Sequence, residues 1–388
     1  MQYPHWTMHP VLPVFFILLA VVVFVQCVYF SLVFVRLVFF KQYQNTILTP
    51  PSVSIVVCAR NELANLQELL PLLIGQDYSD FDIIIAIDRS SDGSNEYIKS
   101  LSSNNKKIKY IEIDKDFRHV TPKKYALTAA IRSSDKEIIL LSDADCRPAS
   151  GQWLRLMANR LSTQKQIVLG FSPYYAESGF LNRLIRFETF YVAVQYLSFS
   201  LAGRPYMGVG RNLMYRRELF IENKGFYTHL SVMGGDDDLL MNEIATPQNT
   251  TICIDPNSFC YSIPKQTWAD WFIQKKRHLS VGKHYKTSNK LMLGTLSASH
   301  ILSWALLGCF TVAGLVNYSI SKNILSLGLI IFFIPRFLQW LILILANRKL
   351  GDTVGWYAVP FIDLVLVLYY VFMAGVMWVN RKTKISWQ

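Results

Sequence analysis

The stretch Val53–Cys58 reads Val-Ser-Ile-Val-Val-Cys and decides the fold class. Short apolar, β-branched runs of this kind form strands that are buried on both faces of a sheet. Similar runs recur at 82–87, 108–113 and 137–142. Helical patterns separate them, at 61–74, from about 94 through Leu101, and at 124–131. This alternation predicts an open, mostly parallel, Rossmann-like α/β sheet covered by helices.

Polar residues follow three of these strands directly. They are Ala59 to Glu62 after the first strand, Asp88 to Asp92 after the second, and Asp143 to Asp145 after the fourth. Ligands of such sheets sit beyond the carboxyl ends of the strands, so one nucleotide pocket can collect all three segments. The first strand is not followed by Gly-x-Gly-x-x-Gly, and the chain has no Gly-Lys-Ser/Thr phosphate loop. A dinucleotide dehydrogenase and a P-loop NTPase are therefore not supported.

Asp143 and Asp145 stand two residues apart just beyond a hydrophobic strand. Mg²⁺ in proteins takes one or two carboxylates together with substrate phosphates, so the pair fits a diphosphate-metal site. Asp-x-Asp in a surface turn is also commonly a solvated loop. The tripeptide alone leaves both interpretations open.

Composition and charge place the chain at a membrane. Its 388 residues are 52% hydrophobic with a formal net charge of +12, which excludes a disordered protein. Segment 41–264 has equal numbers of acidic and basic residues, so the basic excess flanks the apolar segments and is densest at 265–290. A nucleic-acid binder would carry that excess on its folded domain. We therefore expect no nucleic-acid partner, and membrane lipid or a phosphorylated ligand instead.

Four stretches are long and apolar enough to cross a bilayer: 11–35, 291–316, 324–346 and 354–379. The first is predicted to be an uncleaved anchor, and Arg36 and Lys41 behind it predict that residues 41–290 are cytoplasmic. Four simple spans would then put Arg381, Lys382 and Lys384 outside, against the positive-inside rule. Either one carboxy-terminal stretch is re-entrant or the tail charges are overridden. The six cysteines show no metal-ligand spacing and fit reduced thiols.

These patterns predict a multi-pass integral membrane protein in four parts. We expect an anchor at 1–45, an α/β domain at 46–264, a basic amphipathic interfacial segment at 265–290, and a membrane region at 291–388. In the interfacial segment, Lys275, Lys276, Lys283 and Lys286 are expected to meet lipid headgroups. Arg336 and Asp363, inside predicted spans, either pair with each other or line an acceptor path.

The order of seven short motifs resembles glycosyltransferase family 2, the inverting enzymes with a GT-A fold that include polysaccharide synthases and ceramide glucosyltransferases. The motifs are Ser54–Glu62, Asp88 to Gly93, Lys123 to Thr128, Asp143-Ala144-Asp145, Gly208 to Asn212 with Arg216-Arg217, Gly235-Asp236-Asp237, and Gln274 to His278. Thr128 stands where the family usually has Asn. His278 stands where the synthases have a Trp that helps to hold the growing chain, which puts processive polymerisation in doubt.

The resemblance implies a role for each matching position. Ala59, Glu62, Asp88, Lys123 and Asp143 would bind the nucleotide sugar, with Asp88 accepting from the uracil imide. Asp145 would hold Mg²⁺ or Mn²⁺. Gly208, Gly210, Asn212 and His278 would lie on the acceptor side. Gln274 and Arg277 would be catalytic, with Arg277 supporting the departing nucleotide. Asp88 could instead cap a turn, and Lys123 could be a solvated surface lysine.

Asp237 is the residue that the resemblance assigns as general base. The run Asp236-Asp237-Asp238 packs three carboxylates together, and like-charge repulsion raises the proton affinity of at least one. A capped helix start would account for an acidic first turn, but not for three acids directly after Gly234-Gly235.

The sequence thus predicts a membrane-bound inverting glycosyltransferase that moves a sugar, most readily from a UDP-sugar, to a lipid or glycan acceptor. One alternative is a processive polysaccharide synthase with translocation. An alternative of another class is a non-catalytic membrane protein that binds nucleotide sugar, which would have no chemical need for both Asp145 and Asp237.

Overall fold

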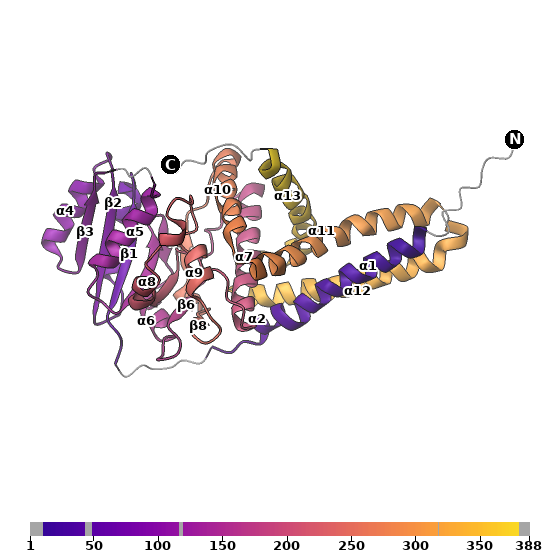
Figure 1. The fold of residues 1–388 in the computed structure, drawn as a ribbon, viewed down its shortest axis with the longest axis horizontal. Helices are drawn as coiled ribbons and strands as arrows, with labels where there is room; N and C mark the ends of the chain where they lie inside the picture. Colours follow the sequence, from indigo (N-terminus) through magenta and orange to yellow (C-terminus); the bar gives the residue numbers. More distant parts are fainter. Residues whose placement is uncertain (1–10, 43–48, 116–118, 317, 380–388) are drawn as a thin grey trace.

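The computed structural model describes residues 11–42, 49–115, 119–316 and 318–379. An α/β domain lies at one end of the molecule, and long apolar helices project from it (Figure 1). Arg381, Lys382 and Lys384 lie outside the described residues, as does the amino-terminal tail before Val11.

The main sheet has seven strands in the order β3-β2-β1-β4-β7-β6-β8. The strands are β1 (Val53–Ala59), β2 (Phe81–Asp88), β3 (Ile108–Ile113), β4 (Ile138–Asp143), β6 (Ile167–Leu169), β7 (Leu213–Arg216) and β8 (Thr250–Ile252). Strands β1 to β4 pair in parallel, as predicted, whereas β7 runs antiparallel to both of its neighbours. The GT-A-like, mostly parallel sheet is therefore confirmed.

Both faces of the sheet are buried, which explains why the first strands are continuously apolar rather than alternating. In β1, Ile55 and Val57 face one core, and Val56 faces the other. The first core is covered by α3 (Leu63–Ile74), α4 (Ser94–Asn104) and α6 (Trp153–Ala158), and the second by α5 (Pro122–Ser133), α7 (Phe180–Leu201) and α9 (Asp238–Ile244). The strand and helix positions predicted between residues 53 and 142 are confirmed.

Most elements after Asp145 were not predicted from the sequence, although α10 (Trp268–Val281) lies in the predicted amphipathic segment 265–290. A two-stranded sheet pairs β5 (Cys146–Pro148) with β9 (Cys260–Ser262) and closes the loop that carries Asp145. The short α8 (Arg217–Glu222) follows β7, and α10 leads toward the apolar helices. The long α7 lies between the sheet and those helices (Figure 1).

Four helices are long and apolar enough to cross a membrane: Leu12–Phe39, Thr287–Val316, Lys322–Lys349 and Trp356–Val376. The first consists of α1 (Val11–Tyr29), a π-helical turn (Phe30–Phe34) and α2 (Val35–Phe39). The others lie in α11 (Thr287–Val316), α12 (Tyr318–Lys349) and α13 (Val359–Val379). These helices fit a membrane protein, with one amino-terminal and three carboxy-terminal segments as predicted.

The two ionisable residues predicted inside the apolar segments do pair. Arg336 Nη1 of α12 lies 3.4 Å from Asp363 Oδ2 of α13, and His300 Nε2 of α11 lies 3.0 Å from Asp363 Oδ1. All three side chains are buried. Of the two alternatives for Arg336 and Asp363, the structure favours pairing over an acceptor path.

Candidate active site

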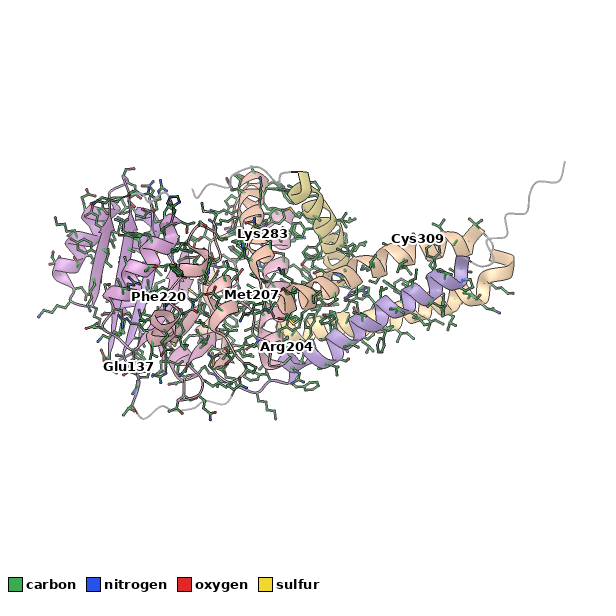
Figure 2. All side chains as sticks on the ribbon, in the orientation of Figure 1. Glu137, Arg204, Met207, Phe220, Lys283 and Cys309 are labelled. Carbon is green, nitrogen blue, oxygen red and sulfur yellow. The ribbon has the colours of Figure 1, made fainter. Side chains whose placement is uncertain are left out.

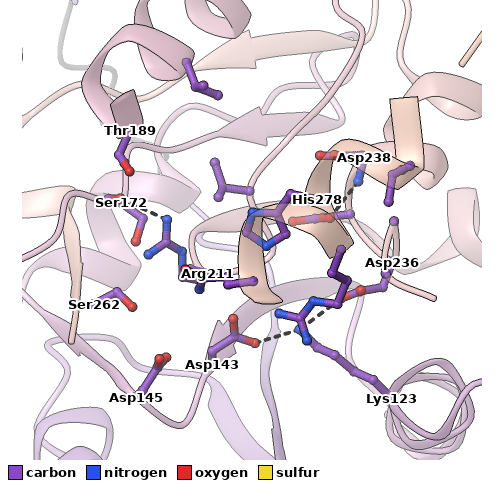
Figure 3. A pocket seen from close by; sticks show the side chains of 18 of the residues that line it. Lys123, Asp143, Asp145, Ser172, Thr189, Arg211, Asp236, Asp238, Ser262 and His278 are labelled. Atoms are coloured by element: carbon purple, nitrogen blue, oxygen red, sulfur yellow. Dashed lines mark hydrogen bonds and ion pairs between the residues drawn. The ribbon is translucent and has the colours of Figure 1, made fainter. Parts of the chain in front are cut away.

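A cavity of about 380 Å³ opens at the carboxyl edge of the sheet, and its wall also includes residues of α7 and α10. The wall brings together side chains that are far apart in the sequence (Figure 3). The predicted site residues found in it are Glu62, Lys123, Asp143, Asp145, Asp237, Gln274, Arg277 and His278.

Lys123, in the first turn of α5, joins two of the predicted motifs. Its Nζ lies 3.0 Å from Asp143 Oδ1 and 3.1 Å from Asp236 Oδ2. Burial lowers the pKa of Lys123, but Asp143, Asp236 and Asp237 together raise it well above the ordinary value. Lys123 is therefore a permanent cation between the strand-end carboxylates and the acidic loop, not a solvated surface lysine (Figure 3).

Asp145 is the carboxylate best suited to a metal ion. Its pKa is raised by burial and by the charge of Asp143. Within the described part of the chain no ion pair involves Asp145, whereas Asp143 is neutralised by Lys123. No cluster of three or more metal-ligating side chains occurs among the described residues. Two carboxylates that still need donor phosphates to complete a coordination shell are the pattern that Mg²⁺ and Mn²⁺ use.

The loop that carries Asp145 is held in place by the buried side chain of Arg147. Its Nη1 donates to the carbonyl oxygens of Ala144 at 3.0 Å and Cys146 at 2.8 Å, the two residues on either side of Asp145. Its Nη2 donates to Asn65 Oδ1 at 3.0 Å. Asn65 in turn donates to Glu62 Oε2 at 2.6 Å. One guanidinium thus ties the Asp145 loop to the Glu62 turn.

The three consecutive acids in the cavity wall have different environments. Burial raises the pKa of Asp236, but Lys123 outweighs it and holds that pKa below the ordinary value. Burial and the charge of Asp236 raise the pKa of Asp237. Burial and the charge of Asp237 raise that of Asp238 well above the ordinary value. Like charges packed this closely separate into one anchored carboxylate and two with higher proton affinity.

Asp237 is oriented by backbone donors on both carboxylate oxygens. Gly210 N donates to Oδ2 at 2.6 Å, and Asp238 N donates to Oδ1 at 2.8 Å. The two glycines before the acids have positive φ angles, +79° at Gly234 and +71° at Gly235, where side chains are strained. A Cβ at Gly235 would also lie 2.8 Å from Leu239 Cγ. The glycine pair therefore permits the sharp turn that brings the acids to the cavity.

Helix α10 supplies Gln274, Arg277 and His278 to the cavity wall. A Cβ at Gly234 would lie 3.5 Å from Arg277 Cγ, so α10 packs against the acidic loop. Partial desolvation in the cavity and the nearby charges of Lys275 and Arg277 hold the pKa of His278 well below its ordinary value, and part of the residue stays exposed. The imidazole is therefore neutral at physiological pH.

The expectation that Lys275 meets lipid headgroups is wrong. Its Nζ forms an ion pair with the carboxylate of Glu188 on α7, and both side chains are 9% exposed. A charge brought this far from water needs a partner, and Glu188 provides it. Both residues line the cavity. The pair joins α7 to α10.

Five predicted site residues are not among the cavity-wall residues. Asn212 is a correction: its buried side chain accepts from Trp153 Nε1 at 2.9 Å and donates to the carbonyls of Phe171 at 2.8 Å and Ser258 at 2.9 Å. It supports the fold rather than facing an acceptor. Asp88 is 1% exposed and accepts from Arg89 Nε at 2.8 Å. The remaining three of the five are Ala59, Gly208 and Gly210, all of which are buried.

Sequence reasoning did not select three cations of the cavity wall, Arg60, Arg211 and Lys265. The guanidinium carbon of Arg211 lies 4.5 Å from the ring centroid of Tyr174, which holds the cation over the aromatic face. Arg211 lies inside the Gly208 to Asn212 motif, in which the prediction named only Gly208, Gly210 and Asn212. The signal that could have identified Arg211 is its place as a cation inside this motif, between Gly210 and Asn212, where it could face a diphosphate.

Carboxylates and cations therefore gather at the carboxyl edge of a GT-A-like sheet. The sequence model described as Glycosyl transferase family 2 matches residues 54–223. The protein therefore carries a glycosyltransferase family 2 domain and is a glycosyltransferase. No curated protein matches the chain.

The chain is similar to a number of solved structures. The mannosyltransferase PcManGT from Pyrobaculum calidifontis, in complex with GDP-Man and Mn²⁺, has a TM-score of 0.57 at 18% identity, covering 87% of this chain and 98% of its own. Residues 1–349 of TarS from S. aureus, in complex with UDP-GlcNAc, give a TM-score of 0.42 at 14% identity, covering 77% and 92%. The similarity to PcManGT supports the GT-A assignment of the fold.

Proposed function

We propose that this protein is a membrane-bound inverting glycosyltransferase that moves a sugar from a nucleotide-diphosphate donor to a hydroxyl of a lipid or glycan acceptor. One observation carries the proposal: Asp145, Lys123 and Asp237 line a single cavity that reaches α7 and α10 beside the apolar helices. A donor-binding carboxylate and a base are needed together only by an enzyme that performs the transfer.

In the proposed reaction, cations of the wall bind the diphosphate of the donor. Lys123, Arg211 and Arg277 come from three different elements and converge on the cavity. Asp145, with the donor phosphates, would hold Mg²⁺ or Mn²⁺, which when bound would offset the negative charge that develops on the leaving nucleotide. Arg277 supports the same charge from α10.

Asp237 is the proposed general base. Its raised pKa makes it a better proton acceptor than Asp236, whose charge is already used by Lys123. It would take the proton of the acceptor hydroxyl as that oxygen attacks the anomeric carbon. The bond between that carbon and the diphosphate breaks in the same step, which inverts the configuration.

For the donor we propose a UDP-sugar, with GDP-sugars as the comparison, because PcManGT was solved with GDP-Man. For the acceptor we propose a lipid presented at the membrane side of the cavity, where α7 supplies Val192, Ala193 and Tyr196 to the wall. The catalytic domain would be cytoplasmic, where nucleotide sugars are available.

The test is transfer by the full-length protein in lipid nanodiscs, offered a panel of UDP- and GDP-sugars with Mn²⁺ and extracted membrane lipid. We expect a lipid product with one added sugar, and a loss of about 10²- to 10⁴-fold in Asp237→Asn. The surface variant Asp135→Asn should retain full activity. Equal product with Asp237→Asn would contradict the base assignment. A ladder of long lipid-free glycan would instead identify a processive synthase.

A further inference from the structure

Helix α13 does not run with the other apolar helices. The segment α1–α2, α11 and α12 lie alongside one another and project away from the α/β domain, and α13 crosses their direction at the domain end (Figure 1). Parallel helices stay parallel in any projection, so α13 is not aligned with that bundle. Its 21 residues would be long enough to span a bilayer. The argument against a membrane span is that α13 is not aligned with the other three apolar segments.

Instead, α13 packs on the two helices that line the active-site cavity. The rings of Tyr369 and Trp271 lie 5.3 Å apart, and those of Phe372 and Phe272 lie 5.4 Å apart. These contacts join α13 to α10. Helices α7 and α10 also cross the bundle direction, as Figure 1 shows. Three transverse helices therefore form a layer between the bundle and the α/β domain.

The orientation of α13 is fixed by a buried polar cluster. Asp363 is held by His300 of α11 and Arg336 of α12, and Trp340 Nε1 donates to its Oδ2 at 3.2 Å. Arg336 Nη2 also donates to Ser303 Oγ at 2.6 Å. Breaking such a cluster would leave charged groups unpaired in an apolar region, which is costly. Rotating α13 into line with the bundle would require that break.

The opposite face of α13 is an exposed apolar stripe. Its members share one side of the helix, at helical spacing, and are 39–64% exposed: Phe361, Leu364, Leu368 and Val371. Phe372, which is 56% exposed, lies at the edge of this stripe beside Phe272. The stripe is continuous with the apolar surface of the bundle through the start of α13, where Trp356 and Tyr357 are also exposed. Aromatic residues of this kind favour the bilayer interface.

Basic residues mark the same end of the bundle. Arg36 lies in α2, and Arg348 and Lys349 close α12. Arg204 and Lys283 also lie at the domain end, whereas Cys309 lies on the part of α11 remote from the domain (Figure 2). These cations at the domain end of the bundle complement anionic headgroups, and the positive-inside rule assigns that end to the cytoplasmic side.

We propose that α13 lies in the plane of the cytoplasmic leaflet, with its stripe buried among headgroups and upper acyl chains. The chain then crosses the membrane three times, and its carboxyl terminus stays on the side of the catalytic domain. With this topology, the basic residues Arg381, Lys382 and Lys384 follow α13 on the cytoplasmic side, as the positive-inside rule expects. The proposal rests on the membrane location in the proposed function, but not on the reaction.

A depth measurement tests the in-plane position. Phe361 and Phe372 are eleven residues apart, as are Leu327 and Leu338 on α12, and all four are exposed. Each is replaced by Cys for spin labelling in full-length protein whose Cys27 and Cys309 are replaced by Ala. Eleven helical residues correspond to about 16 Å along the axis. We expect equal immersion depths for the α13 pair and depths that differ by most of that length for the α12 pair.

A topology measurement tests the same proposal independently. In sealed vesicles, a carboxy-terminal tag should be accessible from the same side as Ser100→Cys on the α/β domain, and from the opposite side to Lys322→Cys. A tag accessible with Lys322→Cys, or α13 labels at graded depths, would overturn the proposal. Extraction of the protein by alkaline carbonate would contradict the membrane location itself. Neither readout depends on glycosyl transfer, so loss of activity cannot mimic either result.

Discussion

The amide of Gly210 donates a 2.6 Å hydrogen bond to Oδ2 of Asp237. This contact joins two motifs that are 27 residues apart and aligns the proposed base from the side of β7. The close approach depends on the absence of a side chain. A Cβ at Gly210 would lie 3.3 Å from Asp237 Oδ2 and 3.5 Å from its Cβ.

Replacing Gly210 by Ala should therefore displace the Asp237 carboxylate by a few tenths of an ångström without removing it. Because a base must reach the acceptor proton closely, we expect kcat to fall by about tenfold while the KM for the donor stays unchanged. Gly282→Ala is the control, since a Cβ there meets no atom within 4 Å. Steady-state kinetics of both variants check this. A raised donor KM with unchanged kcat would argue against the role of the contact.

The charge of Asp236 should be visible in the pH profile. It raises the pKa of Asp237, so the acid limb of kcat should lie above the ordinary Asp value. Asp236→Asn removes that like charge and also leaves Lys123 free to face Asp237. Both changes lower the pKa of Asp237, and the acid limb should move to lower pH. A limb that stays in place or moves to higher pH would rule out Asp237 as the titrating base.

The first half of the α/β domain was predictable because its signal is local. Strands such as Val53–Ala59 are buried on both faces, and the first helix between them, α3, carries leucines at helical spacing. Four apolar helices were predictable for the same reason, since a long uncharged run needs no tertiary information. The second half was not predictable. Strands β5 to β9 have three or four residues each, and short strands are defined by their partners rather than by their own pattern.

The candidate site was predictable as a set of motifs but not as a set of contacts. Ligands of such sheets bind at the carboxyl ends of the strands, and this rule correctly predicted that Glu62, Asp143 and Asp145 share one cavity. It could not reveal that Asn212 turns inward to bind the Trp153 indole, because a buried amide and an acceptor-binding amide look the same in sequence. Lys275 was misread for a similar reason: its partner Glu188 is 87 residues away on a helix that was not predicted.

Arg147 should control metal binding without touching the metal. It donates to the carbonyls of Ala144 and Cys146, on either side of Asp145. Arg147→Met should loosen this loop and weaken Mn²⁺ binding about tenfold, measured by the paramagnetic signal of free Mn²⁺ in the presence of UDP. Arg147→Lys should recover little, because an ammonium lacks the planar fork that joins these carbonyls to Asn65 Oδ1.

The control for Arg147 is Arg155→Met on α6, which removes an exposed pair with Asp77 in the loop after α3. It should leave Mn²⁺ binding unchanged. If Arg147→Met lowers the melting temperature but retains normal Mn²⁺ affinity, then Arg147 has only a structural role. Asp145→Asn sets the scale for complete loss of the site.

Asp238 should make the folded protein less stable as the pH rises. Its pKa is raised well above the ordinary Asp value by burial and by Asp237, although Tyr285 Oη donates to its Oδ2 at 2.9 Å. Between the ordinary pKa, about 3.9, and the raised one, the folded state binds more protons than the unfolded state. Stability therefore falls with rising pH across that window.

The variant Asp238→Asn tests this pH dependence, because it keeps an acceptor for Tyr285 and removes the carboxylate charge. Its melting temperature should match the native protein near pH 4 and exceed it increasingly toward pH 8. Asp135→Asn, at an exposed position, should show no such rise, and a lower melting temperature for Asp238→Asn at pH 8 would mean that the ionised carboxylate is stabilised by the fold.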